Sequence, residues 1–258
     1  MNVGTIHKAT LNLPFLGDLV VNDVTIRMMI LTFVLVAIGS FFLGRKLILR
    51  PGKLQCLTEL LVGGFYDLVE ETLGDKAKTF FPLIMTIFLF VLLANWIGIF
   101  PGMASPTEDL NVCISLAFIV FLVAHGMGIK KKGLWGYLKS YAEPSLLMLP
   151  LNVIGEIGQT LSHCFRLFGN IFGGGIIFAL VPFVTFSILA SLGVPDIATA
   201  TFSEMGIVEW ITYIVLSPVI AVLYFVAYAF FGLFAGTVQA LVFTMLALTY
   251  VSLQIEEG

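Results

Sequence analysis

Long apolar segments separated by short polar ones dominate the pattern of this chain. Roughly 20 apolar residues cross about 30 Å of hydrocarbon, so three segments of ordinary length are predicted to form membrane-spanning helices: 24–49, 79–100 and 111–129. Two further apolar segments, 144–190 and 207–253, each exceed forty residues. We therefore predict an all-α polytopic membrane protein with about five transmembrane helices.

The two longest segments are predicted to form a helical hairpin that crosses the membrane at a steep tilt. As continuous helix each would measure more than ~60 Å at a rise of 1.5 Å per residue, and such a mismatch is accommodated by tilting, kinking or breaking. Pro182 and Pro218 are candidate break points. No internal repeat is evident, which argues against transporters built from inverted halves.

Residues 54–73 follow a different pattern, in which apolar and acidic positions alternate with helical periodicity. This pattern predicts an amphipathic helix that lies at the membrane interface and does not span it. Asp109, which ends the Pro- and Gly-rich segment after the second span, is expected to cap the next helix. We expect one membrane domain over the whole chain, made of these parts: 1–23 outside, 24–129 with three spans, and 144–253 as the hairpin.

Positive charge sets the predicted orientation. Ten of the 13 Lys and Arg residues fall in three segments read as loops: 45–53, 76–78 and 130–139. By the positive-inside rule these loops are cytoplasmic, which places the N-terminus and the loop containing Asp109 outside and, after five spans, the C-terminus inside. The N-terminal segment is too polar for a cleaved signal peptide and is expected to be retained.

Composition excludes several classes of protein. Hydrophobic residues make up 59% of the chain and charged residues 11%, against roughly 25% charged residues in soluble domains. A net charge of −3 gives no basic surface suited to nucleic acid. Three widely spaced cysteines suggest neither a disulfide framework nor a metal cluster, and are expected to be small packing residues. No phosphate-binding or metal-ligand motif is present, so we expect no cofactor and no catalysis on a bound substrate.

One polar stripe interrupts the fifth apolar segment. Six polar residues are spaced by 4, 3, 4, 3 and 4 positions and so share one helix face: Asn152, Glu156, Gln159, His163, Arg166 and Asn170. The stripe is about 27 Å long, and ionisable residues inside a membrane tend to mark pathways for ions or substrates. Arg166 is the central candidate. His163 fits either proton transfer or a structural role.

The last apolar segment carries a matching face. Gly232, Gly236 and Gln239 are spaced by 4 and 3 positions, and small residues permit close helix approach. Ordinary helix packing accounts for the glycines but not for Gln239, whose buried amide needs a partner. Arg166 or Asn170, across the hairpin, is the expected partner. Arg166 has no nearby carboxylate of its own, so its counter-charge is expected from another chain.

These residues resemble a known family. The motif RLFGNIFGG at 166–174, preceded by Glu156 and Ser162, and the segment GTVQALVFTMLALTYVS at 236–252 closely resemble subunit a of the F-type ATP synthase. NWIGIFPG at 95–102 and PTEDLNV at 106–112 look like further family segments. The resemblance extends over about residues 24–253.

The resemblance implies an ion-translocating stator subunit in a bacterial inner membrane. Two offset half-channels would each reach a carboxylate on a rotating ring of c subunits, and Arg166 matches the arginine that separates them. Asn170 and Gln239 match its polar neighbours, while the inner half-channel would be lined by Glu156, Ser162 and His163, with Gln159 in the same stripe. Small residues are expected to face the ring: Gly173, Gly174, Gly232 and Gly236. Further implied partners are the b-type peripheral stalk subunits and the remaining ATP synthase subunits, with the proton as the default ion and sodium left open.

One departure from the family pattern concerns the outer half-channel. Many members have an acid nine residues after the arginine, or a His or Glu seven before the glutamine, where this chain has Gly175 and Gly232. Glu204 or Glu209, with Asp109 nearby, is the expected substitute. The alternative is that these three carboxylates are helix caps and solvated loop charges.

Two other classes of function remain as alternatives. A solute permease would bind a substrate anion at Arg166, and a structural scaffold would explain the glycines without the polar stripe. An Arg166→Lys substitution separates them, because a scaffold tolerates it and a site that needs a planar, permanent cation does not.

Overall fold

The structure, a computed structural model, describes residues 8–13, 17–44, 52–100, 102–142, 145–191 and 207–256. Its longer helices are α1 Asp23–Gly44, α2 Lys53–Leu73, α3 Ala77–Ile97, α4 Leu110–Ser140, α5 Met148–Ser191 and α6 Ile207–Glu256. Two single-turn helices lie between them, η1 Gly74–Lys76 and η2 Pro106–Glu108. A two-stranded antiparallel hairpin, β1 Lys8–Leu13 and β2 Gly17–Asn22, precedes α1.

The prediction of an all-α polytopic membrane protein is confirmed. Four helical stretches among the described residues are long and apolar enough to cross a membrane: 23–42, 53–97, 110–140 and 224–255. Large apolar side chains such as Phe33, Phe42 and Leu122 are exposed on their outer surfaces, as expected for helices surrounded by lipid. The hairpin β1–β2 adds a small sheet within the N-terminal segment 1–23, which was expected to lie outside the membrane.

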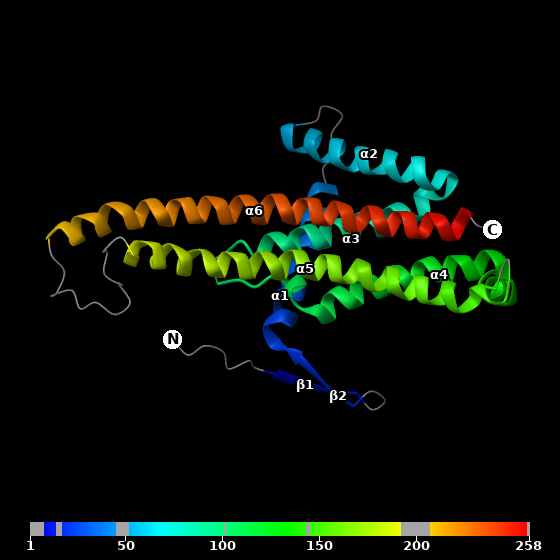
Figure 1. Cartoon of the computed structure of the whole chain (residues 1–258). Coiled ribbons are helices and arrows are strands. Elements are labelled where there is room, and N and C mark those ends of the chain that lie inside the picture. The colour runs from blue at the N-terminus through cyan, green and yellow to red at the C-terminus, as the bar shows by residue number, and fades with distance from the viewer. Residues whose placement is uncertain are drawn as a thin grey trace.

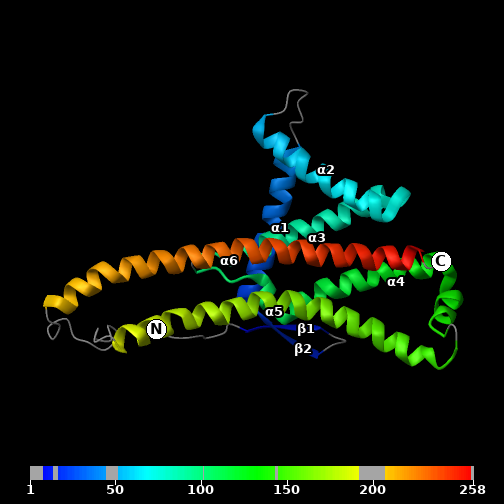
Figure 2. The ribbon, with the colours of Figure 1, turned by 45° about the horizontal axis from the view of Figure 1, so that its top comes forward.

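The two long helices occur where the apolar pattern predicts them. α5 has 44 residues and α6 has 50, and they run antiparallel (Figure 1). The N-terminal part of α5 diverges from α6, and α4 lies between them there (Figure 2). Pro182 and Pro218 lie within these helices and break neither of them. The tilt of the hairpin in the membrane stays a prediction.

The core is formed where α3, α4 and α5 pack against the second half of α6 (Figure 2). Phe88 and Val91 of α3, Leu167 of α5 and Phe243 of α6 are almost fully buried there. Cys113 and Cys164 also lie in this core, as expected, whereas Cys56 on α2 is exposed. The core therefore fixes the Arg166 region of α5 against the Gln239 region of α6.

A buried polar chain fixes α6 against α3. The side-chain amide of Asn95 donates to the Gly236 carbonyl at 3.0 Å and its oxygen accepts from the Thr107 hydroxyl at 2.7 Å. Trp96, the next residue, donates from Nε1 to the Thr237 hydroxyl at 3.1 Å. Because the buried Asn95 side chain has both its nitrogen and its oxygen hydrogen-bonded to fixed partners, these contacts specify one register between α3 and α6.

The lysine-rich segment 130–139 corrects one prediction. The sequence predicts a loop here, but α4 continues through this segment to Ser140, with non-helical backbone angles at Gly133, where φ is 71° and ψ is 161°. Lysine is a good helix former, so the helix continues beyond its apolar part. The positive φ is easily adopted by glycine and turns the last part of α4 in a new direction (Figure 2).

Candidate functional site

The polar stripe on α5 lies at the edge of the helix bundle. At 100° per residue, the six side chains share one narrow face of the helix. One edge of that face, the outer flank, is exposed, and the other edge packs against the rest of the bundle. His163 is 4% exposed and faces inward, whereas Gln159 and Arg166 are exposed. Asn152, Glu156 and Asn170 are half-buried. The stripe thus joins the interior of the bundle to its outer surface.

Arg166 projects from the outer flank of α5. Its side chain is exposed, and no hydrogen bond or ion pair joins it to any described residue. Ser162, one turn earlier, is exposed as well. A Cβ added at Gly173 or Gly174 would have nothing within 4 Å. The exposed side of α5 therefore combines one permanent positive charge with glycines that lack side chains, so a second helix can approach its backbone closely.

Asn170 is the partner of Gln239 across the hairpin. Its amide nitrogen lies 3.4 Å from Gln239 Oε1 and 3.4 Å from the carbonyl oxygen of Ala235. Gln239 is 5% exposed, so this contact confirms that its buried amide is met from α5. Gln239 Nε2 is buried and has no hydrogen-bond partner among the described residues.

A second polar cluster surrounds Glu156, nearer the N-terminus of α5. Its carboxylate accepts from Gln254 Nε2 at 3.2 Å and lies 4.0 Å from His125 Nε2. The Tyr141 hydroxyl lies 3.3 Å from the same His125 nitrogen, and Asn152 donates to the Tyr141 carbonyl at 2.9 Å. These residues come from α4, α5 and α6 or directly follow α4, so the cluster exists only in the folded bundle.

The Glu156 cluster opens into a polar cavity of about 400 Å³. Its lining includes Glu156, Gln159 and Gln254 together with the hydroxyl groups of Tyr137, Ser140 and Tyr141. Such a cavity holds many water molecules. It therefore gives water direct access to the buried part of the stripe from the end of the bundle near the α4 lysines.

Sequence reasoning missed His125, Tyr141 and Gln254. The available signal was weak: His125 is a lone imidazole in an apolar run, and Gln254 follows Gln239 by 15 residues, which is about four helical turns on nearly one face. Tyr141 follows the last residue of α4 and reaches the cluster only because the helix turns at Gly133.

Two glycines that were expected to face a partner ring face α3 instead. A Cβ at Gly232 would lie 2.6 Å from Ile99 Cγ1, and one at Gly236 would lie 3.0 Å from Asn95 Cβ. Both glycines thus permit close packing of α6 on the end of α3. The packing alternative holds for this pair, and the expectation that they face a ring is wrong.

Gly232→Ala should destabilise the protein by about 1–3 kcal/mol, as small-to-large changes in packed cores do. The added methyl group would overlap Ile99, so Ile99→Ala in the same chain should restore much of the loss. Thermal unfolding of the detergent-solubilised single and double variants measures this coupling. Equal unfolding temperatures for Gly232→Ala and the parent would contradict the close contact.

The outer candidates are only partly described. Asp109 caps α4 as predicted, accepting from the Asn111 backbone N–H at 3.0 Å, and it also accepts from the Thr25 hydroxyl at 3.1 Å. Glu204 lies outside the described residues, and Glu209 lies in α6 with its side chain outside them. Glu108 in η2 is a further carboxyl here, and partial burial raises its pKa while a backbone hydrogen bond at Ser105 opposes the shift.

Comparison with known proteins identifies the relatives of this chain. The family model described as ATP synthase A chain matches residues 26–252. The chain is 34% identical over 225 residues to ATP synthase subunit a 2 of Picosynechococcus, covering 86% of this chain and 81% of that protein. It is 30% identical over 250 residues to ATP synthase subunit a of Moorella thermoacetica, covering 95% and 96%. Subunit a 2 of a Bradyrhizobium species is 39% identical over 178 residues, or 69% and 78% of the two chains.

Proposed function

The chain belongs to the ATP synthase A chain family, and from this premise we propose that it conducts ions through two half-channels at its interface with the rotating c-ring. Members of this family are non-catalytic ion-translocating subunits in the membrane sector of the complex. The finer mechanism, in which an ion boards and leaves a ring carboxylate on either side of Arg166, is the part we propose.

The observation that carries the proposal is the exposed guanidinium of Arg166, which pairs with no described residue, on a face of α5 with space above Gly173 and Gly174. A cation in a membrane is costly without a counter-charge, and no described residue supplies one. A ring carboxylate that passes this face would be held ionised by the fixed positive charge and would release its ion there. A permease that binds anions would instead enclose the arginine.

The inner half-channel is assigned to the Glu156 cluster and its polar cavity. Water in this cavity reaches Gln159, and Ser162 and Arg166 follow on the same exposed flank. The contact between Asn170 and Gln239 would hold α5 against α6 close to Arg166, and so fix the position of the arginine at the interface with the ring. His163 would line this path from the buried side of α5.

The outer half-channel is proposed to use Glu204 or Glu209, with Asp109 nearby. Neutralising the functional acid, as Glu204→Gln or Glu209→Gln, should lower ATP-driven ion pumping by about tenfold or more, the smaller end of typical acid–base contributions. Pumping by inverted membrane vesicles measures this. Asp109→Asn tests the third carboxylate, and unchanged pumping in all three variants would contradict the assignment.

The proposed setting is a bacterial inner membrane with the N-terminus outside and the C-terminus in the cytoplasm. All curated relatives named above are bacterial, and the α4 lysines support this orientation. The proposed partners are the c-ring, the b-type peripheral stalk subunits and the other ATP synthase subunits, in contact with membrane lipid.

The function is tested by ATP-driven ion uptake into inverted vesicles from cells that lack the chain, with and without its re-expression. We expect acidification only with re-expression. Two further conditions then identify the ion. A proton pump acidifies the vesicles without sodium, and a protonophore collapses the proton gradient that it forms. Acidification without the chain would overturn the proposal.

A further inference from the structure

The end of α4 beyond Gly133 exposes a group of large apolar side chains. Trp135 is 84% exposed, and Leu134 and Leu138 are more than half exposed. Positions 134, 135 and 138 share one side of a helix, so the three side chains form one surface, the Trp135 face. The described residues leave this surface uncovered.

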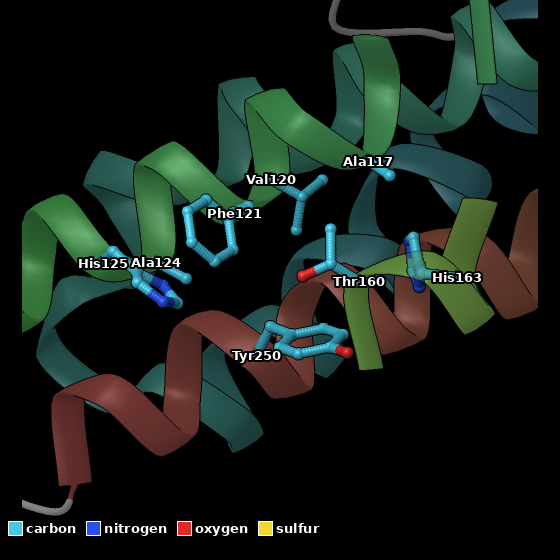
Figure 3. A pocket seen from close by; sticks show the side chains of 8 residues that line it. All are labelled: Ala117, Val120, Phe121, Ala124, His125, Thr160, His163 and Tyr250. Atoms are coloured by element: carbon cyan, nitrogen blue, oxygen red, sulfur yellow. The ribbon is translucent and has the colours of Figure 1, made fainter. Parts of the chain in front are cut away.

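The packing of Tyr137 fixes the direction of this helical end. Tyr137 is buried, and a Cβ added at Gly128 would lie 2.5 Å from its Cε2 atom. Its ring also packs edge-on against His125, with centroids 5.9 Å apart. His125 lies on the side of α4 that faces Tyr250 of α6 (Figure 3). The turn at Gly133 therefore brings Tyr137 back onto the bundle, and the Trp135 face stays on the outside.

The same end of α4 carries an excess of positive charge. Lys131 donates to the Ile255 carbonyl near the end of α6, where Glu256 and Glu257 follow. Glu143, outside the described residues, is the single acid between residues 110 and 155. Three further lysines, the lysine group, form no ion pair with any described carboxylate: Lys130, Lys132 and Lys139.

An apolar surface beside unpaired lysines matches the two parts of an anionic lipid. Tryptophan is enriched where acyl chains meet headgroups, and lysine side chains extend from an apolar surface towards phosphates. Clusters of lysines directly after a membrane span attract anionic lipids, and Lys130 directly follows the apolar part of α4. A free phosphate would satisfy the lysines but would leave the Trp135 face in water.

We propose that the end of α4 is a binding site for anionic lipid. The Trp135 face lies among the acyl chains of the adjacent leaflet, and the lysine group contacts the headgroup phosphates. The bound lipid covers the apolar side chains and supplies the negative charge that the described part of the chain does not provide.

Such a lipid also holds one wall of the polar cavity in place. Tyr137, Ser140 and Tyr141 belong to the same end of α4 or directly follow it, and all three line the cavity of about 400 Å³. Asn152 of α5 donates to the Tyr141 carbonyl at 2.9 Å across this space. This consequence rests on the proposed function, because the cavity affects pumping only if ions pass through it.

Quenching of Trp135 fluorescence by brominated lipids tests the site directly. The complete complex is reconstituted in phosphatidylcholine that contains a minor fraction of brominated phosphatidylglycerol or, separately, of brominated phosphatidylcholine. Trp135 emission is the difference between the parent and Trp135→Phe, so all other tryptophans cancel. Brominated phosphatidylglycerol should quench this emission at a lower fraction than brominated phosphatidylcholine. Equal quenching by the two lipids would overturn the site.

Removing the lysine group tests the source of this preference. A lysine near an anionic surface strengthens binding about fivefold, so changing Lys130, Lys132 and Lys139 together to Gln should weaken the preference for phosphatidylglycerol by about tenfold or more. The matched control also removes three charges, from a stretch, 53–78, that contains five acids: Lys53→Gln, Lys76→Gln and Lys78→Gln. The control should keep the preference. An unchanged preference in the lysine-group variant, or an equal loss in both, contradicts the site.

A second variant tests the apolar half if the lysine-group variant does not assemble. Leu134→Gln with Leu138→Gln keeps every lysine but makes the Trp135 face polar, so Trp135 should move away from the acyl chains. Quenching by both brominated lipids should then fall. Quenching at the parent level would show that this face does not enter the lipid.

ATP-driven pumping in the same liposomes tests the link to the cavity. Phosphatidylglycerol should raise pumping by the parent and the control but not by the lysine-group variant. Equal pumping by the parent with and without this lipid would overturn the link. Arg166→Ala separates the inference from the proposed function: normal pumping by this variant refutes the function, whereas the quenching of Trp135 requires no ion movement and still decides the lipid site.

Discussion

Arg166→Lys is expected to abolish ATP-driven ion pumping even though it retains a positive charge. The guanidinium is planar, presents five donors and does not deprotonate at working pH, whereas the lysine ammonium is a compact charge that loses its proton readily when desolvated. Arg166 has no ion-pair partner among the described residues, so its geometry is available to a passing carboxylate. Losing such a preorganised charged donor costs roughly 10²–10³ in rate, and pumping should fall by about that factor.

The matched control for this substitution is Arg27→Lys. Arg27 is also an exposed arginine on a predicted span, but it pairs with Asp23 one turn away on α1. A surface pair of this kind contributes about 0–1 kcal/mol, so pumping should stay at the parent level. Both variants are compared in inverted vesicles, with complex assembly checked by immunoblot. Normal pumping by assembled Arg166→Lys complex would mean that any cation suffices, and would remove the arginine from its proposed role.

Arg166→Ala distinguishes a barrier from a simple binding site. If the arginine separates two half-channels, its removal opens a leak as well as stopping coupled pumping, because an ion can pass between the half-channels without rotation of the ring. Vesicles with the intact complex should then show passive conductance without ATP hydrolysis. A binding site alone would lose pumping without gaining a leak.

The helices themselves were predictable from the sequence because burial in hydrocarbon leaves a strong one-dimensional signal. The apolar segments 144–190 and 207–253 became α5 and α6 with shifts of a few residues at their ends. Asp109 was predictable as the cap of α4 because its carboxylate accepts a hydrogen bond from a backbone N–H only two residues later, that of Asn111. Both signals are local or periodic, and neither depends on which helices pack together.

The site was predicted in outline but not in its division into two flanks. Spacing placed Gln159 and His163 on one face, yet one is exposed and the other buried. The difference arises because α4 and α6 cover only one edge of that face, and the sequence pattern of α5 contains no information about where its neighbours end. The same reason applies to Gly232. A glycine is equally expected where a helix packs closely on α3 and on a surface that faces another subunit, so the sequence did not distinguish the two.

The Glu156 cluster escaped prediction because it is assembled from separate elements. His125 and Gln254 are more than a hundred residues apart and meet at one carboxylate. Their approach depends on the packing of α4, α5 and α6, and that of Tyr141 also depends on the turn at Gly133. Isolated polar residues in apolar helices are thus useful as candidates, but their grouping requires the three-dimensional structure.

Glu156→Gln is expected to reduce ATP-driven pumping by about tenfold or more, the lower end of what a positioned acid–base group contributes. The amide has the same shape but cannot bind and release a proton or attract a cation into the 400 Å³ cavity. The contact with Gln254 is replaceable, because a glutamine side chain also offers an acceptor oxygen. The variant complex should therefore assemble normally, with its defect confined to ion movement.

Glu59→Gln is the control for this prediction. Glu59 accepts from the Gln55 side-chain amide at 2.8 Å, much as Glu156 accepts from Gln254, but it lies exposed on α2 and lines no described cavity. Pumping in inverted vesicles should be unchanged in Glu59→Gln and partly retained in Glu156→Asp, whose shorter carboxylate still titrates. Equal pumping by Glu156→Gln and Glu59→Gln would show that the cavity needs no charge at this position. Recovery by aspartate alone would show that a titratable carboxylate at residue 156 is what the inner path requires.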